Sequence, residues 1–393
     1  MARNVTVGID IGTSQIKVVV AELVRESGKN LTRIIGTGLS ESRGLRHGYI
    51  VNSDDVAQSI ETAVKLAEKT SGIKINRAFV SVGGIGLSSI TSSASIIISR
   101  ADLQITELDI EKLGKVCEES LPANLLQNNR ILHSIPLTYK IDGKPVLAKS
   151  PLDMKGTKLE VKMLFIVCLD PHLNDLLEEI DKAGIDVVDC LAAPIASSFV
   201  TLSKQQKMAG SVLANIGSET TSIVVFENNI PISLEVFPIG STDITNDIAL
   251  GLKIPLEEAE NIKIGGLGST SFPKKKLDEI ITARLTDMFE LIENHLKKIG
   301  RNGLLPAGIF IIGGGAGINS IEDFAKTFLR LPSRIGSLYT GEQKSGTKDS
   351  IWAVAYGLCM LGLSKEEKTN LGLRNTVNKG GQKVFDWFKQ FLP

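Results

Sequence analysis

The sequence predicts an α/β fold made of two copies of one structural unit, which form two lobes around a cleft. A small α/β subdomain is inserted into the first half, and an amphipathic helix ends the chain. Three observations predict this architecture: an internal repeat, a segment that interrupts it, and an aromatic-rich C-terminal peptide. At 393 residues the chain can form several well-packed domains.

The internal repeat aligns residues 10–22 with residues 215–227 without a gap. Each copy follows an apolar strand, turns at a glycine followed by a hydroxyl residue, and enters a β-branched strand. In each half a third strand and a capped helix are expected next, at 33–39 and 54–71 in the first half and at 232–239 and 241–250 in the second. This order of elements is typical of a duplicated α/β domain.

Two segments interrupt the repeat. Residues 87–161 contain a Ser/Thr/Ile-rich strand, one helix and further strands, which predicts an inserted α/β subdomain. Residues 251–303 are expected to be mainly helical, with a long amphipathic helix at 276–299. Residues 363–382 are polar and rich in Gly, Lys and Asn, and predict a flexible linker.

Composition excludes several classes of function. Lys plus Arg equals Asp plus Glu, 44 against 44, so no charge excess favours a nucleic-acid partner. The four cysteines and four histidines show no metal-ligand spacing, and we expect reduced core thiols. The N-terminus has no signal-peptide pattern, and the longest apolar run, 163–169, is too short to span a bilayer. We therefore expect a cytoplasmic protein whose membrane contact is peripheral.

The two repeated glycine turns predict a phosphate clamp. Tight glycine turns direct backbone N–H groups at phosphate oxygens, and two facing turns could hold a triphosphate from both sides. Asp10 would bind the water shell of a magnesium ion, and Lys17 on the next strand would neutralise a phosphate. A third glycine turn, Gly313 to Gly315, follows another apolar strand.

These segments resemble the motifs of the actin and chaperone-ATPase superfamily. Residues 10–13 resemble its first phosphate loop, 215–220 its second, and 311–316 its adenosine motif. The resemblance implies an actin-like (ribonuclease H-like duplicated) fold that binds ATP and Mg²⁺, with a helical Glu-x-x-Lys around ribose and adenine. The residues implied are Asp10, Gly12, Thr13, Ser14, Lys17, Asn215, Gly217, Ser218, Glu260, Lys263, Gly313, Gly314 and Gly315, with the metal held by Asp10 through water.

Three further segments, 42–50, 151–156 and 193–198, resemble the FtsA family in the same order, and the resemblance covers essentially the whole chain. It implies the following organisation: subdomain IA at 1–84, 166–200 and 336–362; the inserted subdomain 1C at 85–165; subdomain IIA at 201–239 and 306–335; subdomain IIB at 240–305; a linker at 363–380; and a membrane-targeting helix at 381–393.

Departures from the superfamily pattern bear on catalysis. The second phosphate loop usually begins with Asp and contains more glycine, whereas this chain has Asn215, Ser218 and Glu219. Ala193 stands where hydrolysing relatives often place a Glu that positions the attacking water. We therefore expect ATP binding with slow or negligible hydrolysis.

The C-terminal peptide predicts an interfacial membrane helix. Projected at 100° per residue, residues 381–392 form one apolar face and one polar face. The apolar face holds Val384, Phe385, Trp387, Phe388, Phe391 and Leu392, and the polar face includes Lys383 and Lys389. Such a helix would bind anionic lipid moderately, and filament formation would raise the avidity. The alternative is a terminal helix that docks on its own domain.

The FtsA resemblance implies several partners. They are the C-terminal tail of FtsZ, further copies of the chain in an actin-like filament, and later division proteins that bind subdomain 1C. Arg284 matches an arginine of the FtsZ-binding surface. The implied function is to tether FtsZ filaments to the inner face of the cytoplasmic membrane at the division site. Two alternatives remain open: a PilM-like scaffold of type IV pilus assembly, which would not need the tail, and a sugar or metabolite kinase.

Overall fold

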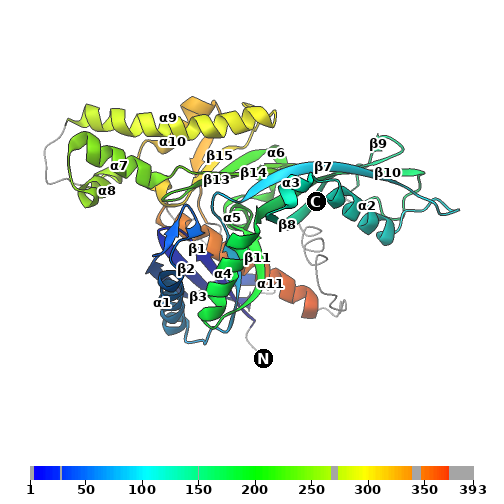
Figure 1. The fold of residues 1–393 in the computed structure, drawn as a ribbon, viewed down its shortest axis with the longest axis horizontal. Coiled ribbons are helices and arrows are strands. Elements are labelled where there is room, and N and C mark those ends of the chain that lie inside the picture. Colours follow the sequence, from blue (N-terminus) through cyan, green and yellow to red (C-terminus); the bar gives the residue numbers. More distant parts are fainter. Residues whose placement is uncertain (1–3, 27–28, 149, 267–272, 339–346, 371–393) are drawn as a thin grey trace. The chain divides into compact units, whose positions relative to one another are not determined.

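The structure is a computed structural model that describes residues 4–26, 29–148, 150–266, 273–338 and 347–370 (Figure 1). The described residues form two compact units. Unit 1 contains the residues up to Gly86 and those from His172 onward, and unit 2 contains Leu87–Pro171. Within the described residues, no helix combines the length and apolarity that a membrane span requires.

Unit 1 contains two five-stranded sheets, which define its first and second lobes. The first sheet has the order β11-β6-β1-β2-β3, and its strands are β1 (Val5–Ile11), β2 (Gln15–Glu26), β3 (Lys29–Glu41), β6 (Arg77–Val82) and β11 (Asp186–Ala192). The second has the order β14-β13-β12-β15-β16, and its strands are β12 (Ser211–Ile216), β13 (Thr221–Glu227), β14 (Ile230–Phe237), β15 (Gly308–Ile312) and β16 (Ser333–Ile335).

The two sheets have the same topology, which confirms the predicted duplication. In each, a three-stranded antiparallel meander is followed by two parallel strands on the other side of its first strand. The register matches as well. Asp10 pairs with Lys17 across β1 and β2, and Asn215 pairs with Ser222 across β12 and β13. Equivalent residues of the two sequence copies therefore occupy equivalent positions in the strand pairing of the two sheets.

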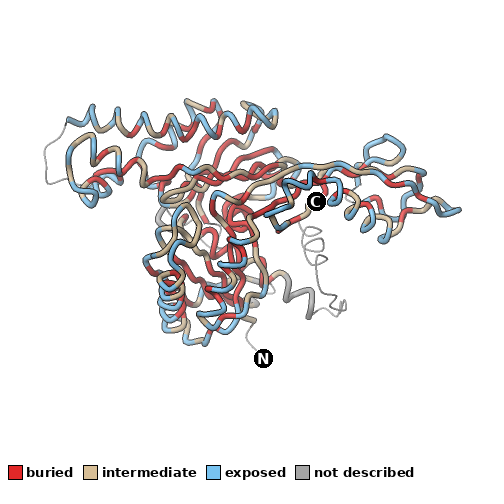
Figure 2. Tube along the Cα trace, viewed as in Figure 1, coloured by how far each residue is buried: buried red, intermediate tan, exposed pale blue. Residues whose placement is uncertain are grey.

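Helices cover both sheets, and the strands between them are largely buried (Figure 2). The first lobe carries α1 (Ser53–Ser71), α4 (Asp170–Lys182), α5 (Ala193–Thr201) and α11 (Ala353–Asn370), with the short β4 (Leu45–Arg46) and β5 (Tyr49–Ile50), and α6 (Lys204–Ala209) leads into the second lobe. The second lobe carries α7 (Ser241–Leu252), α8 (Leu256–Lys263), α9 (Lys274–Lys298) and α10 (Ile321–Leu329). Two short helices complete the unit: η1 (Gly314–Gly317) follows β15, and η2 (Thr347–Trp352) directly precedes α11.

One predicted boundary is wrong. Residues 363–370, assigned to the flexible linker, belong to α11, which continues to Asn370. The segment Ser-Lys-Glu-Glu-Lys consists mostly of good helix formers, and it directly extends a helix that already packs on α5 and β1. Polarity alone was therefore a poor criterion for a linker. The rest of the predicted linker and the amphipathic helix lie outside the described residues.

Close packing of α11 on α5 requires a glycine. A Cβ atom on Gly357 would lie 1.9 Å from the carbonyl oxygen of Ala196, which is backbone and cannot yield. We expect Gly357→Ala to lower the free energy of unfolding by about 2 kcal/mol, the usual cost of overpacking. Gly317→Ala is the matched control, since nothing lies within 4 Å of its added Cβ. Urea denaturation of both variants tests this, and equal stability would show that the helices can separate at little cost.

Unit 2 is a four-stranded antiparallel sheet with a helix on one face. The sheet order is β7-β10-β8-β9, formed by β7 (Ser88–Ile97), β8 (Asn129–Ile141), β9 (Lys144–Pro145) and β10 (Lys158–Leu169), and the helices are α2 (Glu107–Glu119) and α3 (Ala123–Leu126). Leu113 and Cys117 of α2 pack into the core of this unit, beside Phe165 of β10. The predicted inserted subdomain, 85–165, has nearly the same limits as unit 2.

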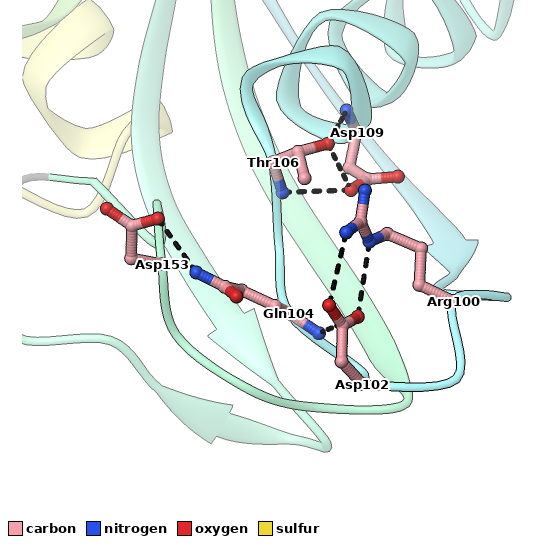
Figure 3. Close-up of polar contacts among 6 residues, drawn as sticks. All are labelled: Arg100, Asp102, Gln104, Thr106, Asp109 and Asp153. Carbon is pink, nitrogen blue, oxygen red and sulfur yellow. Dashed lines mark hydrogen bonds and ion pairs between the residues drawn. The ribbon is translucent and has the colours of Figure 1, made fainter.

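A polar network fixes the loop before α2 (Figure 3). The Arg100 guanidinium donates two hydrogen bonds to Asp102 and holds the pKa of that carboxyl at about 2. Gln104 donates to Asp153, and Thr106 and Asp109 form a capping box at the start of α2. Asp153 belongs to the 151–156 segment, so in this structure that segment braces the loop.

Candidate functional site

The first predicted loop places three polar side chains at the carboxyl end of β1. The Ser81 hydroxyl donates a hydrogen bond of 2.9 Å to Asp10 Oδ1, and Lys17 Nζ lies 4.0 Å from Asp10 Oδ2. Lys17 faces Asp10 because the two residues are cross-strand partners. Ser81 reaches Asp10 because β6 runs parallel to β1, with Ile9 opposite Val80.

Burial disfavours both charges of the Asp10–Lys17 pair. Desolvation raises the pKa of Asp10 above its usual value, against the opposing effects of Lys17 and the Ser81 hydroxyl. Desolvation also lowers the pKa of Lys17, and the nearby carboxylate opposes that change. A ligand with negative phosphate oxygens and an associated cation would offer an opposite charge to each member of this pair.

The two predicted phosphate loops have matching geometry. The Gly12 N–H donates to the Gln15 carbonyl at 3.2 Å, and at the equivalent position the Gly217 N–H donates to the Thr220 carbonyl at 2.8 Å. A Cβ atom on either glycine would lie 3.0 Å from that same carbonyl oxygen. Both turns therefore favour glycine for the same reason.

The third glycine turn packs directly on the second loop. A Cβ atom on Gly313 would lie 2.4 Å from Asn215 Oδ1, and one on Gly315 would lie 2.3 Å from a methyl carbon of Ile216. Gly313 also has φ 88°, in the left-handed region. By contrast, a Cβ on Gly314 would meet nothing within 4 Å, and Gly314 is exposed. Gly313 and Gly315 thus allow the two loops to pack, while Gly314 is open to a ligand.

Glu260 and Lys263, which the resemblance places around ribose and adenine, contact each other in the structure. Lys263 Nζ donates to Glu260 Oε2 at 2.6 Å, to the Ser241 carbonyl at 3.1 Å and to Thr245 Oγ1 at 2.9 Å. The Lys263 side chain is 2% exposed, whereas that of Glu260 is 52% exposed. Lys263 therefore ties α8 to α7, and Glu260 is the member of the pair that remains accessible.

Contacts that the sequence did not predict join the two lobes. The His47 N–H, in the turn between β4 and β5, donates a 2.5 Å hydrogen bond to Glu219 Oε2. His47 Nδ1 also lies 3.2 Å from the Glu219 carbonyl oxygen. Both residues belong to segments singled out in the sequence, but only folding reveals the pairing. Ser81 was missed for the same reason.

Arg284 lies on α9 and is already paired. It donates to both carboxylate oxygens of Asp247 on α7, at 2.7 and 3.1 Å, and lies 3.4 Å from Asp287. The hydrogen bond with Asp247 is the main reason why the pKa of Arg284 is raised. Its side chain is 30% exposed, so a partner could reach its outer edge. Its role in partner binding stays a prediction.

Asp10 fits a magnesium ion held through water. The described residues contain no group of three His, Cys, Asp or Glu side chains arranged around a metal position. Mg²⁺ is commonly held by one or two carboxylates together with retained waters and phosphate oxygens. One buried carboxylate beside a hydroxyl and an ammonium group suits that mode, with Asp10 as the water acceptor.

Comparison with known proteins finds family matches within both units. The family model "Cell division protein FtsA" matches residues 212–357, and "SHS2 domain inserted in FTSA" matches residues 84–167. The FtsA proteins of Borreliella burgdorferi and Bacillus subtilis are 32% and 30% identical. The first alignment covers 86% of this chain and 85% of the relative, and the second covers 84% and 78%.

Solved structures show the same fold. The PilM-PilN type IV pilus biogenesis complex contains a chain with TM-score 0.66 and 17% identity, covering 91% of this chain and 98% of that one. MreB 5 of Spiroplasma citri bound to AMPPNP has TM-score 0.52 and 12% identity, covering 94% and 99%. At these identities the likeness shows the actin-like fold alone. The sequence relatives and the matched inserted subdomain go further: the chain belongs to the FtsA family of cell division proteins.

Proposed function

We propose that this chain binds MgATP between its two phosphate loops, assembles into filaments and tethers FtsZ to the inner face of the cytoplasmic membrane. The observation that carries the nucleotide part is the matching geometry of the Gly12 and Gly217 turns, one from each lobe. A protein of the same fold, MreB 5 of Spiroplasma citri, has been solved with AMPPNP. The C-terminal helix would anchor the filament, and the inserted subdomain would recruit later division proteins.

In the nucleotide complex, Lys17 and the turn N–H groups would bind phosphate oxygens. Asp10 would accept hydrogen bonds from magnesium-bound water, and the ion would screen the phosphate charge. Asn215 is neutral, and Ala193, at the start of α5, offers only a methyl group where a water-activating carboxylate would be needed. We therefore expect slow or negligible turnover, and steady-state hydrolysis at the rate of an efficient ATPase would contradict the proposal.

The membrane part is tested by vesicle co-sedimentation with ATP. We expect the full chain to pellet with anionic vesicles and a chain ending at Asn378 to stay in the supernatant. Within the full chain, Phe388→Asp places a charge on the apolar face and should abolish pelleting. Gln390→Asp places the same charge on the polar face and should weaken pelleting only slightly. If all four proteins behave alike, the tail is no anchor.

The FtsZ part is tested at Arg284. Arg284→Glu would place a carboxylate beside Asp247 and Asp287 and present negative charge to the FtsZ tail. We expect affinity for a peptide of that tail to fall about tenfold or more, as for a lost charge-assisted hydrogen bond. Lys297→Glu, on the same helix, is the control. Unchanged peptide affinity in a folded Arg284→Glu protein would remove this arginine from the interface.

A further inference from the structure

The bond between Glu219 and His47 connects the second phosphate loop to the first lobe. Glu219 follows Ser218 directly, so its carboxylate extends from the loop that is proposed to hold phosphate. Two contacts meet at His47: the carboxylate accepts its N–H, and the Glu219 carbonyl lies 3.2 Å from its ring Nδ1. A carbonyl can only accept, so Nδ1 is the donor in this bond.

The His47 turn is firmly attached to the first lobe. His47 has φ 48° and Gly48 has φ 85°, and a Cβ on Gly48 would lie 2.3 Å from Gly84 Cα. The Ile85 N–H donates to the His47 carbonyl at 3.2 Å. Gly84 and Ile85 follow β6, the strand that carries Ser81 and through it contacts Asp10. Movement of the turn is therefore coupled to the end of β6.

The loop that carries Glu219 is equally fixed to the second lobe. The first two N–H groups of α7, from Ser241 and Thr242, donate to the carbonyls of Gly217 and Ser218, each at 2.8 Å. Gly240 packs against the Ser218 carbonyl so closely that a Cβ there would lie 2.2 Å from its oxygen. Glu219 thus joins one rigid block to another, and separating the lobes at this point requires breaking its bonds to His47.

We propose that Glu219 is a latch that sets how long a nucleotide stays bound between the two phosphate loops. This inference rests on the proposed nucleotide-binding function. A ligand held by loops from both lobes leaves when the loops separate, and the latch adds its own bonds to that step. Removing it should speed release while leaving the approach of the ligand largely unchanged.

The latch does not depend on an ion pair. The described residues give the Glu219 carboxylate no salt bridge, and its partner is a backbone N–H, which no ordinary substitution removes. A glutamine amide oxygen can accept the same hydrogen bond without the charge. Glu219→Gln therefore retains the latch in weaker form. Glu219→Ala removes the side-chain hydrogen bond and leaves only the contact between the residue 219 carbonyl and the His47 ring. Glu61→Ala deletes an exposed carboxylate on α1, paired there with Lys65, and is the matched control.

The test is stopped-flow release of a fluorescent ATP analogue from the full chain in the presence of Mg²⁺. A hydrogen bond to a charged group contributes enough that its loss should speed release by roughly 10- to 100-fold in Glu219→Ala. We expect Glu219→Gln to stay within about threefold of the parent protein, and Glu61→Ala to match it. Hydrogen exchange of the His47 amide, measured without nucleotide, reports whether this hydrogen bond forms, and should accelerate strongly in Glu219→Ala and much less in Glu219→Gln.

The possible outcomes distinguish a failure of the latch proposal from a failure of the proposed nucleotide binding. If the unsubstituted chain binds no nucleotide, both the proposed function and the latch are wrong. If it binds, but folded Glu219→Ala releases the analogue at the parent rate, the latch alone is overturned. Equal acceleration in Glu219→Ala and Glu219→Gln would also overturn it, because charge rather than the hydrogen bond would then control release.

Discussion

Replacing Asp10 by alanine is expected to abolish MgATP binding and to lower the free energy of unfolding by about 3 kcal/mol or more. The Asp10 and Lys17 side chains are 13% and 11% exposed, and the carboxylate is the main compensation for the buried ammonium. Breaking a buried pair by removing one partner typically costs about 3–5 kcal/mol, because the other charge is left uncompensated. Urea denaturation and calorimetric titration with MgATP measure the two effects.

Companion variants separate stability from binding. Asp10→Asn keeps the shape and an acceptor for the Ser81 hydroxyl, so it should fold better than Asp10→Ala while losing the magnesium-dependent part of the affinity. The double variant Asp10→Asn/Lys17→Met should be more stable than the sum of the single effects predicts, because neither charge is left unpaired. Additive stabilities would show that Asp10 and Lys17 are independent, and unchanged MgATP affinity in Asp10→Asn would exclude the metal role.

The duplicated architecture could be predicted because its determinants are local. A glycine turn after an apolar strand and before a β-branched strand specifies a hairpin wherever it occurs, and two gapless copies specify two equivalent hairpins. The same locality explains the helices after the third strands, whose start signals are short-range. It also explains why Asp10 and Lys17, assigned from the sequence to one site, face each other, since both residues lie on one hairpin.

Features that depend on distant packing could not be predicted. Ser81 reaches Asp10 only through the parallel pairing of β6 with β1, and 172 residues separate His47 from Glu219. Lys263 belongs to a recognisable Glu-x-x-Lys pattern, but its contacts with Ser241 and Thr245 depend on how α8 packs on α7. Sequence patterns identified the candidate site residues, and the fold determined which of them meet.

Lys207 is another residue whose environment depends on distant packing, and its burial predicts a large change of stability with pH. On sequence it is an ordinary lysine of a short, polar helix, yet it is 5% exposed in the structure. Its ammonium lies 5.1 Å from the ring centroid of Phe199 and 5.0 Å from that of Phe226. The ring faces attract a cation, but they replace only part of its hydration. Burial therefore lowers the pKa of Lys207 to about 7.

This depressed pKa makes stability depend on pH in a defined direction. In the unfolded chain Lys207 keeps its proton up to its ordinary pKa of 10.5, whereas the folded chain releases it near 7. Between these values the unfolded state binds more protons, so the contribution of Lys207 to the free energy of unfolding rises with pH. From about pH 7 to about pH 9.5 the rise should be roughly 3 kcal/mol.

Comparison with Lys207→Met isolates this effect. Buried thiols act in the opposite sense above about pH 9, because burial raises the pKa values of Cys168 and Cys359 in the folded chain. Their contribution is common to both proteins and cancels in the difference. We therefore expect Lys207→Met to be more stable than the parent protein at pH 7. Between pH 7 and about pH 9.5, the difference in the free energy of unfolding should shift by roughly 3 kcal/mol in favour of the parent protein. A stability difference that does not change with pH, measured by urea denaturation, would mean that Lys207 keeps its proton inside the fold.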